Sequence, residues 1–193
     1  MHHTIRLASD ADVAALLDIY AWYVENTAFS FEYEPPGLPE FKDRIQRYMQ
    51  EAPWLVARMD DQPVGFAYAS PHRGRSAYRW NREVSIYFKP DFHGSGLATH
   101  LYQTLFNFLR HQGYANALAG IVSPNPRSVA FHEKLGFHRV AVYPNIGYKF
   151  NRWYETHWYS LLLQEPTYQP GTILPVKKVL EMEAFSNLSI GKG

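Results

Sequence analysis

Hydrophobic positions recur along the chain with two periods, and each period predicts a different kind of element. Apolar residues spaced three to four positions apart predict amphipathic helices. The expected helices are Asp10–Asn26 with Asp10 as its N-cap, Leu38–Gln50, Leu97–Gln112 ended by Gly113, and Pro126–Leu135 ended by Gly136.

Shorter runs, alternating or continuously apolar, predict strands. The expected strands are Thr4–Ala8, Trp54–Met59, Val64–Ala69, Glu83–Phe88, Ala115–Val122, Phe137–Val142 and Trp153–Leu163, with a hairpin turn at Asp60–Pro63 and a short extended segment at Phe29–Tyr33. The order β-α-α-β-β-β-α-β-α-β-β is neither a regular βαβ alternation nor an all-β pattern. It predicts an α/β (α+β) fold, with helices on the faces of a mixed sheet.

A length of 193 residues favours one domain with a terminal extension. The composition changes beyond Pro166, where only Val176–Phe185 has a helical pattern. We therefore expect a catalytic or binding domain over residues 1–165 and an extension of unknown role over residues 166–193.

Charge and composition exclude several classes of function. With 19 basic and 18 acidic residues, the net charge of +1 offers no general attraction for nucleic acid or an anionic membrane. Without cysteine, the chain has no disulfide, thiolate nucleophile or thiolate-ligated metal. None of the nine histidines falls in an HxxxH or HExxH pattern, so no metal is expected. No apolar run approaches the ~20 residues of a membrane span and no secretory signal is visible, which predicts a cytoplasmic protein.

The segment His93-Gly94-Ser95-Gly96-Leu97-Ala98 joins an expected strand to a long expected helix. Glycines let backbone N–H groups turn toward one point, and the helix N-terminus adds partial positive charge, an arrangement that holds phosphate. An ordinary glycine-containing turn would look the same, so the loop alone leaves both interpretations open. A P-loop is excluded because GxxxxGK[ST] is missing, and a dinucleotide site is disfavoured because no acid lies near residues 115–119.

A second motif begins at Asn125-Pro126, a favourable N-cap and first helical residue, and continues through Ser128, His132 and Gly136-Phe137. Together the two motifs resemble the acetyl-CoA-binding signatures of the GCN5-related N-acetyltransferase (GNAT) superfamily. His93 departs from the Gln or Arg usual at the first position of the loop.

The resemblance is closest to the phosphinothricin and methionine sulfoximine N-acetyltransferase subfamily and extends from about Ile5 to Leu163. It rests on the stretches Phe29–Pro35, Pro53–Ala57, Gly65–Ala69, Arg73–Trp80, Ser128–Phe137 and Gly147–Lys149. It implies the GNAT fold, with about seven strands and about four helices. It also implies a homodimer that takes acetyl-CoA and a small amine, with no nucleic-acid or membrane partner.

The resemblance also implies which residues bind acetyl-CoA. The coenzyme would contact Ile86, Tyr87, Phe88, His93, Gly94, Ser95, Gly96, Leu97, Ala98, Thr99, Asn125 and Ser128. Of these, the backbone of Ile86–Phe88 would pair with the pantetheine arm as an added strand does.

The chemistry of acetyl transfer gives the remaining candidates their roles. An amine is mostly ammonium at pH 7 and needs a proton acceptor, for which the resemblance suggests Glu83. His132 would protonate the leaving thiolate. Arg73 and Arg75 would bind an acidic or tetrahedral group of the substrate, and Phe31 would form a pocket wall. Each residue also has a purely structural or solvated interpretation. A non-catalytic acyl-CoA-binding module on the same fold is the alternative function.

Overall fold

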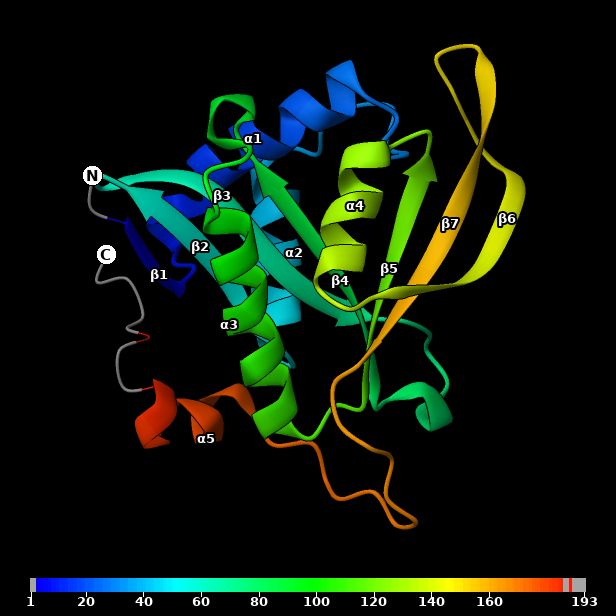
Figure 1. The fold of residues 1–193 in the computed structure, drawn as a ribbon. Coiled ribbons are helices and arrows are strands. Elements are labelled where there is room, and N and C mark those ends of the chain that lie inside the picture. Colours follow the sequence, from blue (N-terminus) through cyan, green and yellow to red (C-terminus); the bar gives the residue numbers. More distant parts are fainter. Residues whose placement is uncertain (1–2, 186–187, 189–193) are drawn as a thin grey trace.

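The computed structural model describes residues 3–185 and residue 188. These residues form a seven-stranded sheet of order β1-β2-β3-β4-β5-β7-β6 with helices on both faces (Figure 1). The strands are β1 His3–Leu7, β2 Trp54–Met59, β3 Gln62–Pro71, β4 Asn81–Phe88, β5 Asn116–Ser123, β6 His138–Lys149 and β7 Arg152–Leu162. The helices are α1 Val13–Asn26, α2 Leu38–Met49, α3 Leu97–Gln112, α4 Pro126–Lys134 and α5 Val176–Leu180. The predicted mixed sheet is confirmed.

The centre of the sheet is its irregular point. β4 and β5 run parallel and pair only over Asn81–Glu83 and Asn116–Leu118, whereas the neighbouring pairs are antiparallel. Beyond Glu83, β4 continues along β3 to Phe88, and β5 continues along β7 to Ser123. The two strands therefore separate and leave a gap inside the sheet.

Each face of the sheet has its own apolar core, because successive side chains of a strand point to opposite faces. On β2, Trp54 and Val56 pack with α1 and α2, while Leu55 and Ala57 pack with α3. All four side chains are at most 1% exposed. The helices of both faces are thus held to one rigid sheet, which fixes the ends of β4 and β5.

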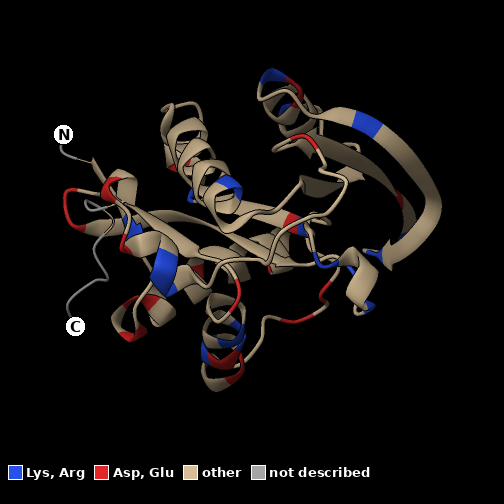
Figure 2. Ribbon diagram, turned by 90° about the horizontal axis from the view of Figure 1, so that it is seen from below, with Lys and Arg blue, Asp and Glu red and all other residues tan. Residues whose placement is uncertain are grey.

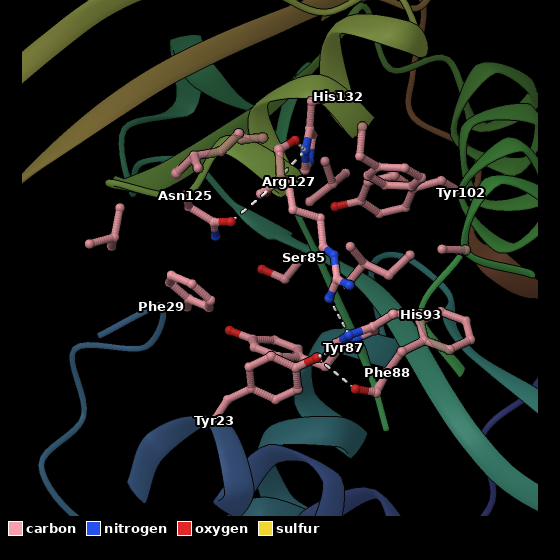
Figure 3. A pocket seen from close by; sticks show the side chains of 18 of the residues that line it. Tyr23, Phe29, Ser85, Tyr87, Phe88, His93, Tyr102, Asn125, Arg127 and His132 are labelled. Atoms are coloured by element: carbon pink, nitrogen blue, oxygen red, sulfur yellow. Dashed lines mark hydrogen bonds between the residues drawn. The ribbon is translucent and has the colours of Figure 1, made fainter. Parts of the chain in front are cut away.

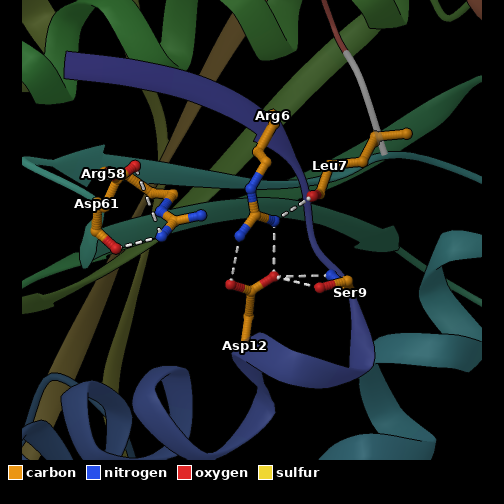
Figure 4. Close-up of polar contacts among 6 residues, drawn as sticks. All are labelled: Arg6, Leu7, Ser9, Asp12, Arg58 and Asp61. Carbon is orange, nitrogen blue, oxygen red and sulfur yellow. Dashed lines mark hydrogen bonds and ion pairs between the residues drawn. The ribbon is translucent and has the colours of Figure 1, made fainter. Parts of the chain in front are cut away.

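A buried ion pair fixes the start of α1 to β1 (Figure 4). Both guanidinium N–H groups of Arg6 donate to the Asp12 carboxylate, at 2.7 and 2.6 Å, and Ser9 donates to it from its backbone and hydroxyl. The predicted N-cap role of Asp10 is wrong, because a 3₁₀ turn at Asp10–Asp12 precedes α1. Asp10 faces α2 instead, where it pairs with Lys42 at 2.7 Å.

The β2–β3 turn is tighter than predicted. Met59 pairs directly with Gln62, which leaves only Asp60 and Asp61 in the loop, both with positive φ (44° and 65°). Such two-residue turns match the twist of the flanking strands. Arg58 hydrogen-bonds to the backbone of Asp61 across the turn (Figure 4).

The last hairpin differs most from the prediction. The strand expected over Phe137–Val142 extends to Lys149, with a register shift between Tyr143 and Gly147. Pro144 and Asn145 fall within that irregularity, and they account for the missing strand pattern. The lengthened hairpin projects beyond the body of the sheet (Figure 1).

Lys149, at the end of β6, is 2% exposed and connects this hairpin to the last turn of α1 and the segment that follows it. Its ammonium donates to the carbonyl groups of Val24, Thr27 and Ser30 at 2.6, 2.9 and 2.8 Å. Bends at residues 28–30 and 33–34 interrupt the extended segment expected over Phe29–Tyr33.

The described part of the C-terminal segment packs on α3. The helix expected over Val176–Phe185 is divided into α5 and a 3₁₀ turn at Glu183–Phe185. Val179 and Phe185 form a separate apolar cluster with Phe108 of α3. The expected extension also includes residues 186–187 and 189–193, which lie outside the described residues. Within the described chain, no helix has both the length and the apolar character needed to cross a bilayer.

Candidate active site

A cavity of about 380 Å³ occupies the gap where β4 and β5 separate (Figure 3). Its walls come from residues 84–88 of β4, residues 119–122 of β5, the loop before α3, and α4. Eight of the predicted coenzyme residues line it: Ile86, Tyr87, Phe88, His93, Gly94, Ala98, Asn125 and Ser128. Ser95, Gly96, Leu97 and Thr99 lie in the same loop and first helical turn but are not among the residues that line the cavity.

The glycine loop adopts a conformation that few other residues tolerate. Gly94 and Gly96 have φ values of 82° and 84°, and Gly96 is the N-cap of α3. No heavy atom lies within 4 Å of the place that a Cβ would take at either glycine. The loop therefore leaves open space at the start of a 16-residue helix, and this geometry fits a phosphate group.

Asn125 has the local role expected from its position before a proline. Its side-chain oxygen accepts a hydrogen bond from the backbone N–H of Ser128 at 3.1 Å, so it caps α4. The same side chain lines the cavity. Capping thus fixes a polar group at the wall that faces β4.

His132 is buried in the cavity wall, 4% exposed. Its Nδ1 lies 2.8 Å from the carbonyl oxygen of Ser128, which can only accept, so Nδ1 carries the proton. Burial lowers the pKa of His132, which keeps the ring neutral near pH 7. Its Nε2 is left with a lone pair and, within the described residues, with no hydrogen-bond partner.

Tyr102 of α3 lies beside His132, with ring centroids 5.5 Å apart. Its hydroxyl is buried, lines the cavity, and has no hydrogen-bond partner in the described part of the chain. Burial raises the pKa of Tyr102 well above its usual range, so this hydroxyl keeps its proton. Nothing in the helical pattern of α3 distinguished this tyrosine from a core residue.

A second cavity of about 420 Å³ adjoins the first and shares part of its wall. The shared residues are Phe29, Val84, Ser85, Gly120 and Val122. Glu83 and Phe31 line the second cavity, as do Tyr143 and Ile146 of β6. Glu83 is thus one residue away from the wall that separates the two spaces.

Glu83 has a hydrogen-bond partner that the sequence did not indicate. Its carboxylate lies 2.8 Å from Nδ1 of His72 at the end of β3. Burial raises the pKa of Glu83, and the contact with His72 and the charge of Arg73 oppose that rise. His72 directly precedes Arg73, and no pattern in the sequence distinguished it as a site residue.

The two predicted substrate arginines lie outside the cavity walls. Arg73 and Arg75 are exposed, and neither is among the residues lining the second cavity. The guanidinium carbon of Arg73 instead stacks 5.7 Å from the Tyr78 ring. Phe31 does lie in the wall, pressed against Gly147, where an added Cβ would come within 2.3 Å of the Phe31 ring.

Arg127 is a further residue that the sequence did not single out. It lies in the first turn of α4, lines the first cavity, and points across it toward His93 (Figure 3). Its NH1 is 2.5 Å from Nδ1 of His93. Only the meeting of α4 with the loop before α3 brings these residues together.

No group of three or more His, Cys, Asp or Glu side chains suited to a metal ion occurs among the described residues. The expected absence of a metal remains a prediction.

Comparison with known proteins gives consistent matches. Residues 5–158 match the family described as "Acetyltransferase (GNAT) domain". The chain is 33% identical to a phosphinothricin N-acetyltransferase of Streptomyces viridochromogenes, over 91% of this chain and 95% of the relative. It is 32% identical to an L-methionine sulfoximine/L-methionine sulfone acetyltransferase of Salmonella typhimurium, over 84% and 95% of the two chains.

Among solved structures, the chain is similar to a GNAT superfamily phosphinothricin acetyltransferase of Sinorhizobium meliloti in complex with acetyl-CoA. The TM-score is 0.82, the identity 31%, and the match covers 88% of this chain and 96% of the other.

Proposed function

The chain belongs to the acetyltransferase (GNAT) family, and from that premise we propose that it acetylates a small amino-acid-like amine. Family membership makes it an acetyl-CoA-dependent N-acetyltransferase. The finer proposal is a substrate of the phosphinothricin, methionine sulfoximine or methionine sulfone type, acetylated by direct transfer in a ternary complex. The observation that carries it is the shared wall between the cavity in the β4–β5 gap and the cavity that contains Glu83.

The first cavity would hold the acetyl-pantetheine arm of acetyl-CoA. The glycine loop would take the diphosphate at the start of α3. The backbone of Ile86–Phe88, unpaired toward β5, would hydrogen-bond to the amide groups of the arm. The reactive thioester would then lie near the shared wall, because that wall forms the end of the cavity closest to Glu83.

Glu83 would act as the base. The amine enters as ammonium, and Glu83 takes its proton directly or through water before nitrogen attacks the thioester carbon. The half-buried position of Glu83 supports this role, since burial raises the pKa of its carboxyl toward the working pH. His72 would orient the carboxylate through the 2.8 Å hydrogen bond.

Two groups would serve the leaving thiolate. His132 is the acid that the sequence suggested, but its neutral ring carries the proton on Nδ1, which faces Ser128. The Tyr102 hydroxyl offers a proton that has no described acceptor. We propose that the Tyr102 hydroxyl protonates the thiolate and that the second proton lost by the attacking nitrogen restores this hydroxyl, with the neutral His132 ring packed beside it.

The second cavity would hold the amine substrate. Phe31 would pack against its carbon chain, while Arg73 and Arg75 would bind its acidic or tetrahedral group from the rim. Their exposure leaves their guanidinium groups available to a ligand. The guanidinium group of an arginine can donate two hydrogen bonds to the oxygens of one phosphinate. This favours the proposed substrate class over polyamines, which are cationic.

A homodimer would use the β6–β7 hairpin. This hairpin exposes large apolar side chains, including Val140, Ile146, Phe150 and Trp153, which are 53%, 55%, 52% and 60% exposed. Large apolar side chains exposed along one hairpin are a surface that an interface would cover. A cytoplasmic location likewise remains a prediction.

Thiol release from acetyl-CoA tests the substrate proposal. We expect release with phosphinothricin, methionine sulfoximine or methionine sulfone, and much weaker release with polyamines and peptide N-termini. Turnover confined to polyamines or peptides would contradict the substrate class. A non-catalytic acyl-CoA-binding module would bind the coenzyme and release thiol with none of these amines.

A further inference from the structure

Arg127 is the only lysine or arginine among the described residues that line the coenzyme cavity. The loop that would hold the diphosphate, residues 93–98, contains no lysine or arginine. Coenzyme A carries negative charge on its diphosphate, and backbone N–H groups alone would have to balance it. Arg127 can supply the missing positive charge.

A chain of hydrogen bonds holds Arg127 in the cavity and fixes the tautomer of His93. The Tyr23 hydroxyl donates to the carbonyl of Phe88 at 2.6 Å, which uses its single proton. At the 2.9 Å contact with His93, the Tyr23 oxygen must therefore accept, so Nε2 of His93 carries the ring proton. Nδ1 is left with a lone pair and accepts from Arg127 at 2.5 Å.

Electrostatics agree with this neutral form of His93. Burial and the charge of Arg127 lower the pKa of His93, and only Asp91 and the Phe88 carbonyl oppose them. A neutral imidazole accepts from the guanidinium without repelling it. The two residues that hydrogen-bond to the His93 ring are Tyr23 of α1 and Arg127 of α4. These elements are far apart in the sequence (Figure 3).

We propose that Arg127 binds the diphosphate of the coenzyme, and that His93 is a positioning residue that holds its guanidinium beside the glycine loop. The inference rests on the coenzyme site of the proposed function and adds the residue that provides its positive charge. It also explains the unusual loop position, because the side chain at 93 turns to Tyr23 and Arg127. Glutamine would present the same pair of groups, an N–H donor for Tyr23 and an oxygen acceptor for Arg127.

Isothermal titration calorimetry of the purified protein with CoA and with 3′-dephospho-CoA tests the assignment. We expect Arg127→Gln to weaken both ligands by about tenfold to a hundredfold, as for a lost charge-assisted hydrogen bond to phosphate. Lys134→Gln removes an exposed positive charge from the same helix outside the cavity, and should change both dissociation constants less than about twofold. Arg127 is exposed, so its variant should keep the wild-type Tm.

Substitutions at His93 test the positioning role. His93→Leu should weaken CoA about threefold to tenfold, His93→Gln should restore binding to within about twofold of wild type, and His93→Leu should add nothing in an Arg127→Gln background. Additive losses in the double variant would overturn the positioning role.

Different outcomes of these titrations test the proposed coenzyme site and the role of Arg127 separately. Wild-type protein that fails to bind CoA would contradict the proposed function itself. Wild-type binding with an unchanged Arg127→Gln variant, or with equal losses in Arg127→Gln and Lys134→Gln, would overturn the assignment of Arg127 alone. A loss seen with CoA but absent with 3′-dephospho-CoA would place Arg127 at the 3′-phosphate and overturn the diphosphate assignment.

Discussion

The two adjoining cavities share a wall but are built from different parts of the chain. The first cavity, which we propose holds the coenzyme, is lined mainly by β4, β5, α3 and α4, and its only Lys or Arg among the described lining residues is Arg127. The second cavity takes residues from the segment after α1 and from the β6–β7 hairpin, and the only charged residue in its described lining is Glu83. Along the ribbon of Figure 2, lysine, arginine, aspartate and glutamate positions lie mostly on helices and loops.

This difference indicates that the two cavities bind different substrates. Strands β4 and β5 and the loop before α3 bring backbone groups and glycines to the first cavity, which suits a coenzyme that is the same in every reaction. The segment after α1 and the β6–β7 hairpin bring bulky side chains to the second cavity, which suits an amine that varies between enzymes. Substitutions in one cavity should therefore change the kinetics of one substrate and leave the binding of the other intact.

Glu83→Gln should have the largest effect on amine turnover relative to its effect on CoA binding. This change removes the base and keeps the shape, so kcat/KM for the amine should fall about 10²- to 10⁴-fold. The dissociation constant of CoA, measured by calorimetry, should stay within about twofold. Turnover close to wild type would show that Glu83 is not the base, and loss of CoA binding would show that the cavities are not independent.

A smaller effect is expected on the coenzyme side from Tyr102→Phe, which removes only a hydroxyl. The kcat should fall about tenfold or more, since the thiolate would lose its proton donor. His132→Phe should lower kcat less, because Nε2 of the neutral ring carries no proton. Steady-state measurement of kcat for both variants tests this order. A larger fall in kcat for His132→Phe than for Tyr102→Phe would show that His132 is the acid.

Phe31→Ala should affect only the amine. Removing this wall of the second cavity should raise the amine KM by about fivefold to tenfold, consistent with loss of about 1–1.4 kcal/mol of apolar contact. The KM for acetyl-CoA should not change. Glu34→Ala is a control on the same segment, because Glu34 is exposed and does not line either cavity.

The smallest effect at neutral pH is expected from His72→Phe, which is visible mainly in the pH profile. His72 lowers the pKa of Glu83, so its removal raises that pKa. A base is active when ionised, above its pKa, so the acidic limb of kcat/KM should move to higher pH. The plateau at high pH should remain within about threefold of wild type, and a shift to lower pH would contradict the contact's role.

The coenzyme side was the more predictable of the two from sequence alone. Its signals are local, because positive-φ glycines at 94 and 96 and the cap at Asn125 act within a few residues of themselves. The same local patterns placed β4 immediately before the loop and β5 immediately after α3, but they did not predict that the two strands pair in parallel and then separate.

Contacts between distant segments could not be predicted in this way. His72 meets Glu83 because β3 and β4 pair in register, with Ser70 opposite Glu83. Arg127 meets His93 only once α4 has packed across the gap. Lys149 looks like a surface residue in the sequence, but it is buried by three carbonyl groups of another segment.

The early separation of β4 from β5 has a consequence for how the protein avoids aggregation. Most exposed strand edges can recruit a strand from another molecule. Here the unpaired side of β4 beyond Glu83 lies inside the sheet and lines a cavity whose other walls include β5 and α4. The fold thus keeps this unpaired strand side away from the two outer strands of the sheet, β1 and β6.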